Sequence, residues 1–229
     1  MTSTALAGHR LTIRPCRVPG CTSNAHGHGK FCNGHNSSYR RHGAPNQKGI
    51  STVELRTYLK LVDQRISKNH ESPLWAALDG RWQDLTVHAR EIVGRSQAQP
   101  RWQRDAARAV VKLAESVEPR DIVRTVLAVY IMEGSEGRRF VDDRAFQFQL
   151  VRRVRLLSEV NVGRYHNHAT GKTKRVYRDL APRIVLCLAK WLVEFFGSAG
   201  VWIAKLEKDQ NEAEQRERED VKAALAGLR

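Results

Sequence analysis

The chain has 229 residues, and a hydrophobic content of 41% with five tryptophans is ample for a packed core. Its formal net charge of +15 favours an anionic polymer as partner, most simply a nucleic acid, with DNA expected in preference to RNA. No apolar run reaches the roughly 18 residues that a membrane span needs. Because no secretory signal is visible either, we expect a cytoplasmic protein that binds no membrane and associates with the nucleoid if it binds DNA.

The first 50 residues are the most one-sided in charge. They contain seven Lys and Arg side chains and no Asp or Glu. They also lack periodic apolar residues, and a segment this small generally needs a staple to fold. We expect a flexible basic arm at residues 1–13, followed by a zinc-binding module. The arm and the module together make up residues 1–46. The glycines and proline of residues 43–49 predict a linker to an α-helical domain at residues 47–229.

Three of the four cysteines lie close together near the N-terminus, with the spacing Cys-x4-Cys-x10-Cys-x2-His. This spacing predicts one zinc ion held by Cys16, Cys21, Cys32 and His35 in a closed structural site. Thiolates suit zinc because they are soft and anionic. The Cys-x2-His pair lets a single tight turn present two ligands to one ion.

Two alternatives to this ligand set stay open. A disulfide with scattered thiols is one, although thiols stay reduced in a protein without a secretory signal. A different fourth ligand is the other, because His26 and His28 lie inside the ten-residue loop and compete with His35.

The motif continues beyond the ligands as Tyr39-Arg40-Arg41-His42-Gly43-Ala44-Pro45. With Cys-x3-Gly-Cys and Gly-Lys-Phe-Cys-x2-His before it, residues 14–46 resemble a small zinc finger of phage and mobile-element proteins. Such fingers often precede an HNH endonuclease domain. Asn36 departs from the pattern, since an aromatic residue often follows the histidine. The resemblance implies a metal site and says little about activity, because these fingers are joined to different partners.

A basic run directly follows the last predicted zinc ligand. Guanidinium groups suit phosphates and the acceptor edge of guanine, and an aromatic ring beside them can stack or wedge. Phosphate anchoring is the expected use, since most such contacts go to the backbone. A solvated basic surface is the alternative. The predicted nucleic-acid contacts of the module are Arg14, Arg17, Lys30, Tyr39, Arg40 and Arg41.

About eight helices are expected after residue 50, so the fold class is mainly α. Ser51-x-x-Glu54 forms a capping box at the start of the first of these helices. Ser72-Pro73 marks the next start, and a break near Gly80 is expected to separate a short helix from a longer one. Later helices are expected to start at Pro100, Pro119, Asp142 or Asp143, Asp179 and Ser198. The segment from Asp179 to Gly197 is the most apolar and is expected to lie in the centre of the core.

Residues 162–177 break this helical pattern. They are polar and contain glycine, which predicts a loop or a short hairpin that turns at Thr170-Gly171. No acidic residue interrupts the segment, so it forms a second basic cluster. The predicted nucleic-acid contacts of this cluster are Lys172, Lys174, Arg175 and Arg178.

Three apparent signs of catalysis fail on inspection. His166-Asn167-His168 spells the name of the HNH nucleases, but adjacent residues cannot converge on one catalytic metal. Gly171-Lys172-Thr173 lacks the glycine five residues earlier that a phosphate-binding loop requires. The acidic residues between 133 and 143 fit helix capping better than a nuclease metal site.

These observations together predict a zinc-dependent nucleic-acid-binding protein of a phage or mobile element that is not an enzyme and has no catalytic residues. A nuclease or recombination factor that uses the zinc module for targeting is one alternative, with a catalytic site assembled from distant residues. A protein–protein adaptor is the other, in which the helical domain binds a partner or a second copy.

Overall fold

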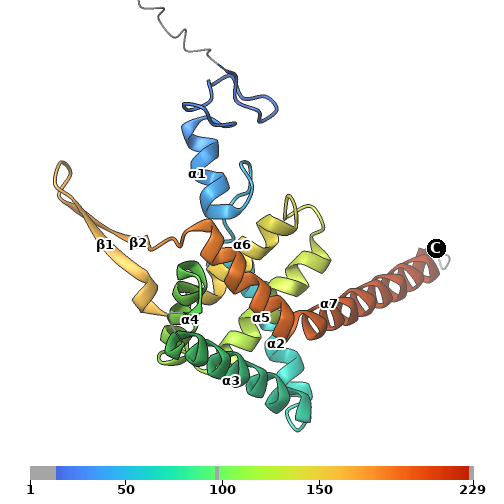
Figure 1. Ribbon diagram of the computed structural model, residues 1–229. Coiled ribbons are helices and arrows are strands. Elements are labelled where there is room, and N and C mark those ends of the chain that lie inside the picture. Colours follow the sequence, from blue (N-terminus) through green and yellow to red (C-terminus); the bar gives the residue numbers. More distant parts are fainter. Residues whose placement is uncertain (1–13, 96–97, 227–229) are drawn as a thin grey trace, which may run out of the picture.

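The computed structural model describes residues 14–95 and 98–226, and the predicted basic arm at residues 1–13 lies outside them (Figure 1). The described chain is mainly helical, as predicted, with a cysteine-rich module in front of a helical body. The helices are α1 (Asn33–His42), α2 (Thr52–Lys68), α3 (Pro73–Gly94), α4 (Arg101–Ala114), α5 (Pro119–Ser135), α6 (Asp143–Arg155) and α7 (Pro182–Ala226). A short 3₁₀ helix, η2 (Glu159–Asn161), leads into strands β1 (Val162–Asn167) and β2 (Lys172–Tyr177).

Local capping signals in the sequence fix several helix starts. The Ser51 side chain accepts a hydrogen bond from the Glu54 backbone, and the Glu54 carboxylate accepts one from Ser51, which confirms the capping box. Ser72 caps α3 ahead of Pro73. Of the two candidates for α6, Asp142 is the cap, because its carboxylate accepts a hydrogen bond of 2.7 Å from the Ala145 backbone.

Two predicted helix breaks do not exist. The α3 helix runs through Gly80. The α7 helix, which is 45 residues long in total, runs through Ser198. One glycine costs a helix interior only about 1 kcal/mol, so the packing of both flanking segments outweighs it. In the residues that the structure describes, the body therefore has six α-helices where about eight were expected, and α1 adds a seventh within the N-terminal module.

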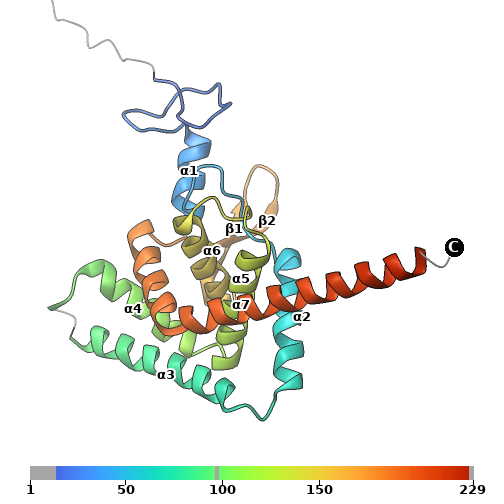
Figure 2. The ribbon, with the colours of Figure 1, turned by 90° about the vertical axis from the view of Figure 1, so that its right-hand side faces the viewer.

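The core is organised around α5, with α7 packed along it. Every α5 residue from Ile122 to Met132 except Arg124 is buried. The α7 helix buries apolar side chains of its first half against α4, α5 and α6, among them Leu188, Leu192 and Phe196. The most apolar segment of the sequence is therefore part of the core as predicted, but α5 is the helix enclosed by the others (Figure 2).

The second half of α7 leaves the body and continues alone, as Figures 1 and 2 show from two directions. Every side chain from 208 to 223 is exposed, and pairs such as Arg216 with Glu212 lie along the helix. Contrary to the sequence expectation, the segment Pro182–Ala223 is long and apolar enough to cross a membrane by length and composition. Since 44% of its apolar window is buried in the core, this property does not separate a span from an ordinary core helix.

The glycines of α3 and α7 give a matched pair of stability predictions. A Cβ added at Gly80 would meet nothing within 4 Å, so Gly80→Ala should raise the free energy of unfolding by about 0.5–1 kcal/mol. A Cβ added at Gly200 would overlap the Tyr130 ring, so Gly200→Ala should lower that free energy by about 1–3 kcal/mol. Urea unfolding followed by circular dichroism measures both, and effects of the same sign would contradict the packing described.

Candidate metal centre and basic surface

The N-terminal module, residues 14–46, folds as two short loops in front of α1. An isolated bridge pairs Pro15 with Asn24, and backbone hydrogen bonds from Cys16 to Ser23 and from Arg17 to Lys30 bring the loops together. Gly20 has a φ of 76°, which a residue with a side chain rarely adopts, so glycine suits the turn that follows Pro19.

The Cys-x2-His pair occupies the first turn of α1. Cys32 is the N-cap residue with extended backbone angles, and His35 is the third helical residue. An N-cap side chain and the third helical residue face each other, which is the geometry that a capping box uses for hydrogen bonds. Here the same geometry brings the Cys32 sulfur to 3.3 Å from His35 Nδ1.

The four predicted ligands converge. The ligand atoms of Cys16, Cys21, Cys32 and His35 all lie within 4.8 Å of one another, and all four cysteines of the chain are free thiols. The Cys16 sulfur lies 3.4 Å from His35 Nδ1, so this ring nitrogen is the one that points into the cluster. Three thiols and an imidazole at tetrahedral spacing are a donor set that can hold one metal ion.

The surroundings of the thiols affect their ionisation unequally. Burial opposes ionisation of Cys16, but hydrogen bonds from the backbone at Val18 and Cys32 and from His35 outweigh it and lower the pKa of Cys16 from 9.0 to about 6. At Cys21 a backbone hydrogen bond at Ser23 lowers the pKa, while burial and the two neighbouring thiols raise it above 9.0. The Cys16 thiol therefore ionises more readily than the Cys21 thiol.

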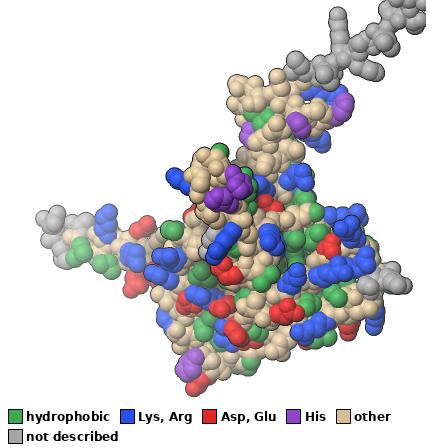
Figure 3. Space-filling model, turned by 90° about the vertical axis from the view of Figure 1, so that its left-hand side faces the viewer, with side chains coloured by type: hydrophobic (Ala, Val, Ile, Leu, Met, Phe, Trp, Pro, Cys, Tyr) green, Lys and Arg blue, Asp and Glu red, His purple; other side chains and the backbone are tan. Residues whose placement is uncertain are grey.

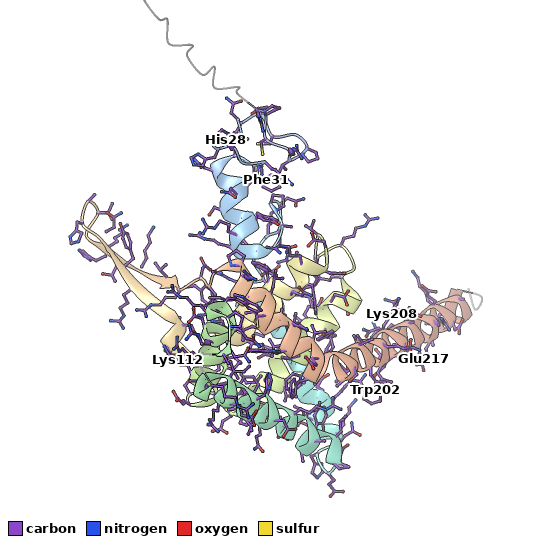
Figure 4. All side chains as sticks on the ribbon, viewed as in Figure 1. His28, Phe31, Lys112, Trp202, Lys208 and Glu217 are labelled. Carbon is purple, nitrogen blue, oxygen red and sulfur yellow. The ribbon has the colours of Figure 1, made fainter. Side chains whose placement is uncertain are left out.

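The competing histidines lie outside this cluster. His26 and His28 are exposed, and within the described residues the Cys16–His35 quartet is the only group of its kind. Figure 4 places His28 at the outer edge of the module, whereas Phe31 lies beside α1. The geometry thus favours His35 as the fourth ligand.

The module is attached to the body by packed contacts. The Arg144 guanidinium lies 4.9 Å from the ring centroid of Tyr39 and also covers Phe148, while Phe31 packs against Tyr39 from the module side. A Cβ at Gly43 would lie 2.6 Å from the Arg144 carbonyl, so glycine is required there. Tyr39, predicted as a nucleic-acid contact, is half-buried and joins α1 to α6.

The segment predicted as a linker is in fact packed against the body. Ala44 and Gln47 are buried, and the Gln47 amide donates to the Arg139 carbonyl and accepts from the Val141 backbone. Gln149 accepts a hydrogen bond from the Ile50 backbone in the same region. The glycines and proline of this segment form a turn, and side-chain contacts to the body fix its position. The sequence alone does not reveal these contacts.

One arginine of the first predicted basic cluster shares a carboxylate with an arginine of α6 near the base of the hairpin. Arg41 of α1 forms an ion pair of 3.1 Å with Asp179, and Arg152 of α6 forms one of 2.9 Å with the same residue. The Arg152 guanidinium lies 4.3 Å from the ring centroid of Tyr177, the last residue of β2. Arg40 has no ion pair or hydrogen bond with any described residue and is exposed beside a cleft of about 450 Å³ between α1 and the start of α7.

The remaining predicted contacts are at the surface. Figure 3 looks onto the side from which the hairpin projects and shows Lys and Arg side chains spread over it, with Asp and Glu among them. Of Arg175 the structure describes only the backbone. The exposed members of the predicted set are Arg14, Arg17, Lys30, Arg40, Arg41, Lys172, Lys174 and Arg178.

Sequence reasoning did not single out the residues that hold the hairpin in place. Arg155 is 4% exposed and donates hydrogen bonds to the Tyr177 hydroxyl at 2.7 Å, to the Arg178 carbonyl at 3.0 Å and to the Asn161 side chain at 2.8 Å. Burial raises the pKa of Tyr177, although Arg155 and Arg152 act against that rise. The only signal in the sequence was that Arg155 falls on the arginine-rich side of α6.

Two of the three apparent signs of catalysis have structural explanations. His166 and His168 stack edge to face at 5.0 Å, and His166 Nδ1 lies 3.0 Å from the Thr173 hydroxyl across the hairpin. Asp142 caps α6, and Glu136 accepts a hydrogen bond from Tyr58.

Comparison with known protein families, curated proteins and solved structures finds no significant match to this chain.

Loss of one ligand should remove the metal and unfold the module only. Cys32→Ser is expected to abolish bound metal, because folding and metal binding are a single event in a module without a core. The helical body should keep its thermal transition, since its core contains no ligand residue. Elemental analysis of purified protein and circular dichroism measure the two effects.

Cys187 provides the matched control for that variant. It is a buried thiol of α7, far along the chain from the quartet, and burial raises its pKa to about 11. Cys187→Ser should leave the metal content unchanged. A Cys32→Ser protein that retains a full equivalent of metal would contradict the assigned ligand set.

Proposed function

We propose that this protein is a zinc-dependent nucleic-acid-binding protein whose polymer is DNA and which breaks no bond itself. The observation that carries the proposal is that Arg41 of α1 and Arg152 of α6 share Asp179, while Arg152 also stacks on Tyr177, so the exposed arginines of α1 lie near the base of the basic hairpin. Residues far apart in the sequence thereby contribute to one cationic side of the molecule. A polyanion is the partner that such a surface fits.

Zinc is the metal proposed for the quartet. Three thiolates and one imidazole form the donor set of closed structural zinc sites, and they leave no coordination position for a substrate or a catalytic water. Bound zinc would supply cohesion to a module in which, among the described residues 14–42, Cys16 alone is buried. In this proposal the metal's role is to hold α1 where its arginines reach the polymer.

Backbone phosphates are the proposed ligands of α1. Arg40 is exposed and unpaired within the described chain, and it lines the cleft together with Asn36 and Ser37. Guanidinium and amide groups donate hydrogen bonds to phosphate oxygens. The N-terminal end of α7 opens at the same cleft, and its dipole adds to the positive potential there.

Phage or mobile-element origin and a cytoplasmic location belong to this proposal as well. The first is supported by the resemblance of residues 14–46 to a finger of such proteins, and the second by the free thiols of the quartet, which suit a reducing compartment. A role without catalysis is supported by the structural explanations found for the acidic and histidine motifs.

A protein–protein adaptor is the second candidate, favoured by the part of α7 that projects from the body. Trp202 is 53% exposed where the helix leaves the core, and every side chain from 208 to 223 is exposed. Removal of residues 211–229 should abolish self-association measured by light scattering if this reading is right. Unchanged mass and unchanged DNA affinity would count against it.

The proposed function predicts a steep dependence of affinity on salt. If six or more phosphates are contacted, affinity for a DNA duplex should fall by about 10³-fold or more between 50 and 200 mM salt. Arg40→Gln should weaken binding about fivefold to tenfold on every sequence and lower the salt slope by about one. Fluorescence anisotropy at several salt concentrations measures both quantities.

Lys208→Gln is the matched control, because Lys208 is an exposed cation on the projecting part of α7 (Figure 4). It should leave the affinity and the slope unchanged. A flat salt response of the unaltered protein, or equal losses in the two variants, would rule out the proposed phosphate contacts.

A further inference from the structure

We infer that the β1–β2 hairpin is a preorganised arm that enters the major groove of B-form duplex DNA. This inference rests on the proposed function and adds to it the structural form of the polymer and the element that enters it. The hairpin projects away from the body on the side opposite to the free end of α7 (Figure 1). Its strands pair in regular antiparallel register from Val162–Tyr177 to Asn167–Lys172.

The base of the hairpin is fixed to α6. Arg155 donates hydrogen bonds to Asn161, just before β1, and to Tyr177 and Arg178 at the end of β2. Asn161 donates one back to the Arg155 carbonyl at 2.8 Å. One buried guanidinium therefore holds both strands where they leave the body.

The same junction orients the ring at the end of β2. The Arg152 and Arg155 guanidiniums lie 4.3 Å and 5.1 Å from the Tyr177 ring centroid. Arg152 is also paired with Asp179, which binds Arg41 of α1. The hairpin and the N-terminal module are thus joined through one ion-pair network, so they are presented to a ligand in a fixed relation.

The outer part of the hairpin carries exposed apolar side chains that do not stabilise the fold. Tyr165 is 59% exposed and Val176 is 45% exposed, yet the ribbon has no other layer to pack against. An isolated two-stranded ribbon is only marginally stable, and exposed apolar side chains on it are unfavourable in water. Contact with a partner would remove this cost.

The charge of the hairpin identifies the partner as anionic. Residues 162–178 contain five Lys and Arg and no Asp or Glu. The register places Tyr165 opposite Lys174 and Asn167 opposite Lys172, so an aromatic ring, an amide and two ammonium groups share one face. Ammonium groups can bind phosphates along the groove edges, while the ring and the amide can contact base edges.

Size selects among nucleic acids. A strand of six residues is about 20 Å long, and a two-stranded ribbon fits a B-form major groove that is about 12 Å wide and 8.5 Å deep. The major groove of A-form RNA is deep and too narrow for protein elements. The arm therefore favours duplex DNA over duplex RNA.

The test compares three changes in the full-length protein. Tyr165→Ala removes the ring, Lys172→Gln with Lys174→Gln removes the two charges on the same face, and a third variant replaces residues 165–174 by a two-residue Asn-Gly turn. Metal content and the thermal transition should stay unchanged in all three, because the hairpin contributes nothing to the core. Lys208→Gln serves as the charge control.

The expected results separate groove contact from general attraction. Tyr165→Ala should lower affinity for duplex DNA about fivefold or more with an unchanged salt slope, whereas the double variant should lower the slope by about two. Affinity for duplex RNA should not change. The unaltered protein should protect guanine N7, a major-groove atom, from methylation by dimethyl sulfate, and the shortened hairpin should lose that protection.

Several outcomes would overturn the inference. Unchanged duplex affinity in all three variants, equal losses on duplex RNA, or a loss confined to single-stranded DNA would each do so, the last indicating base stacking on Tyr165. Arg40→Gln measured in parallel separates failure of the hairpin inference from failure of the proposed function. If it weakens binding while the hairpin variants do not, only the arm is wrong, whereas a protein that binds no DNA refutes the proposed function itself.

Discussion

The convergence of three thiols and one imidazole within 4.8 Å is the constraint on which the N-terminal half of the cationic surface depends. The module has almost no core, and α1 contains no buried residue. Its two loops and its helix are held by the quartet at one end and by the contact of Tyr39 with Arg144 at the other. Whatever occupies the quartet therefore determines whether the arginines of α1 have a defined position at all.

Asp179 gives the molecule its second organising point. Two arginines from different helices share this carboxylate, and one of them stacks on the tyrosine that ends the hairpin. Because exposed ion pairs contribute little free energy individually, the value of the network is geometric. It links the module and the base of the hairpin to one body, while Arg40 stays exposed and unpaired within the described chain. The projecting half of α7 lies apart from this region. Its charged side chains form pairs of opposite sign along the helix.

Local signals made much of this predictable. The ligand spacing identified the quartet, and Ser51, Ser72 and Asp142 identified three helix starts, because each is a contact between residues a few positions apart. The failures have a common cause as well. A break at Gly80, a separate helix from Ser198 and a linker after Gly43 were all expected from residues that interrupt local structure. Packing across the body overrode each of them, at a cost of about 1 kcal/mol per helical glycine.

The sequence by itself determined the helical class, the Cys3His group that could hold a metal ion and the presence of two clusters of positive charge, since spacing and composition are properties of short segments. Only the tertiary structure decided that Arg41 and Arg152 share Asp179, that Arg155 holds the hairpin and that Tyr39 packs against Arg144 of the body. Each of these depends on side chains more than twenty residues apart. Their proximity is set by how α6 and α7 pack in the core, and no local pattern records it.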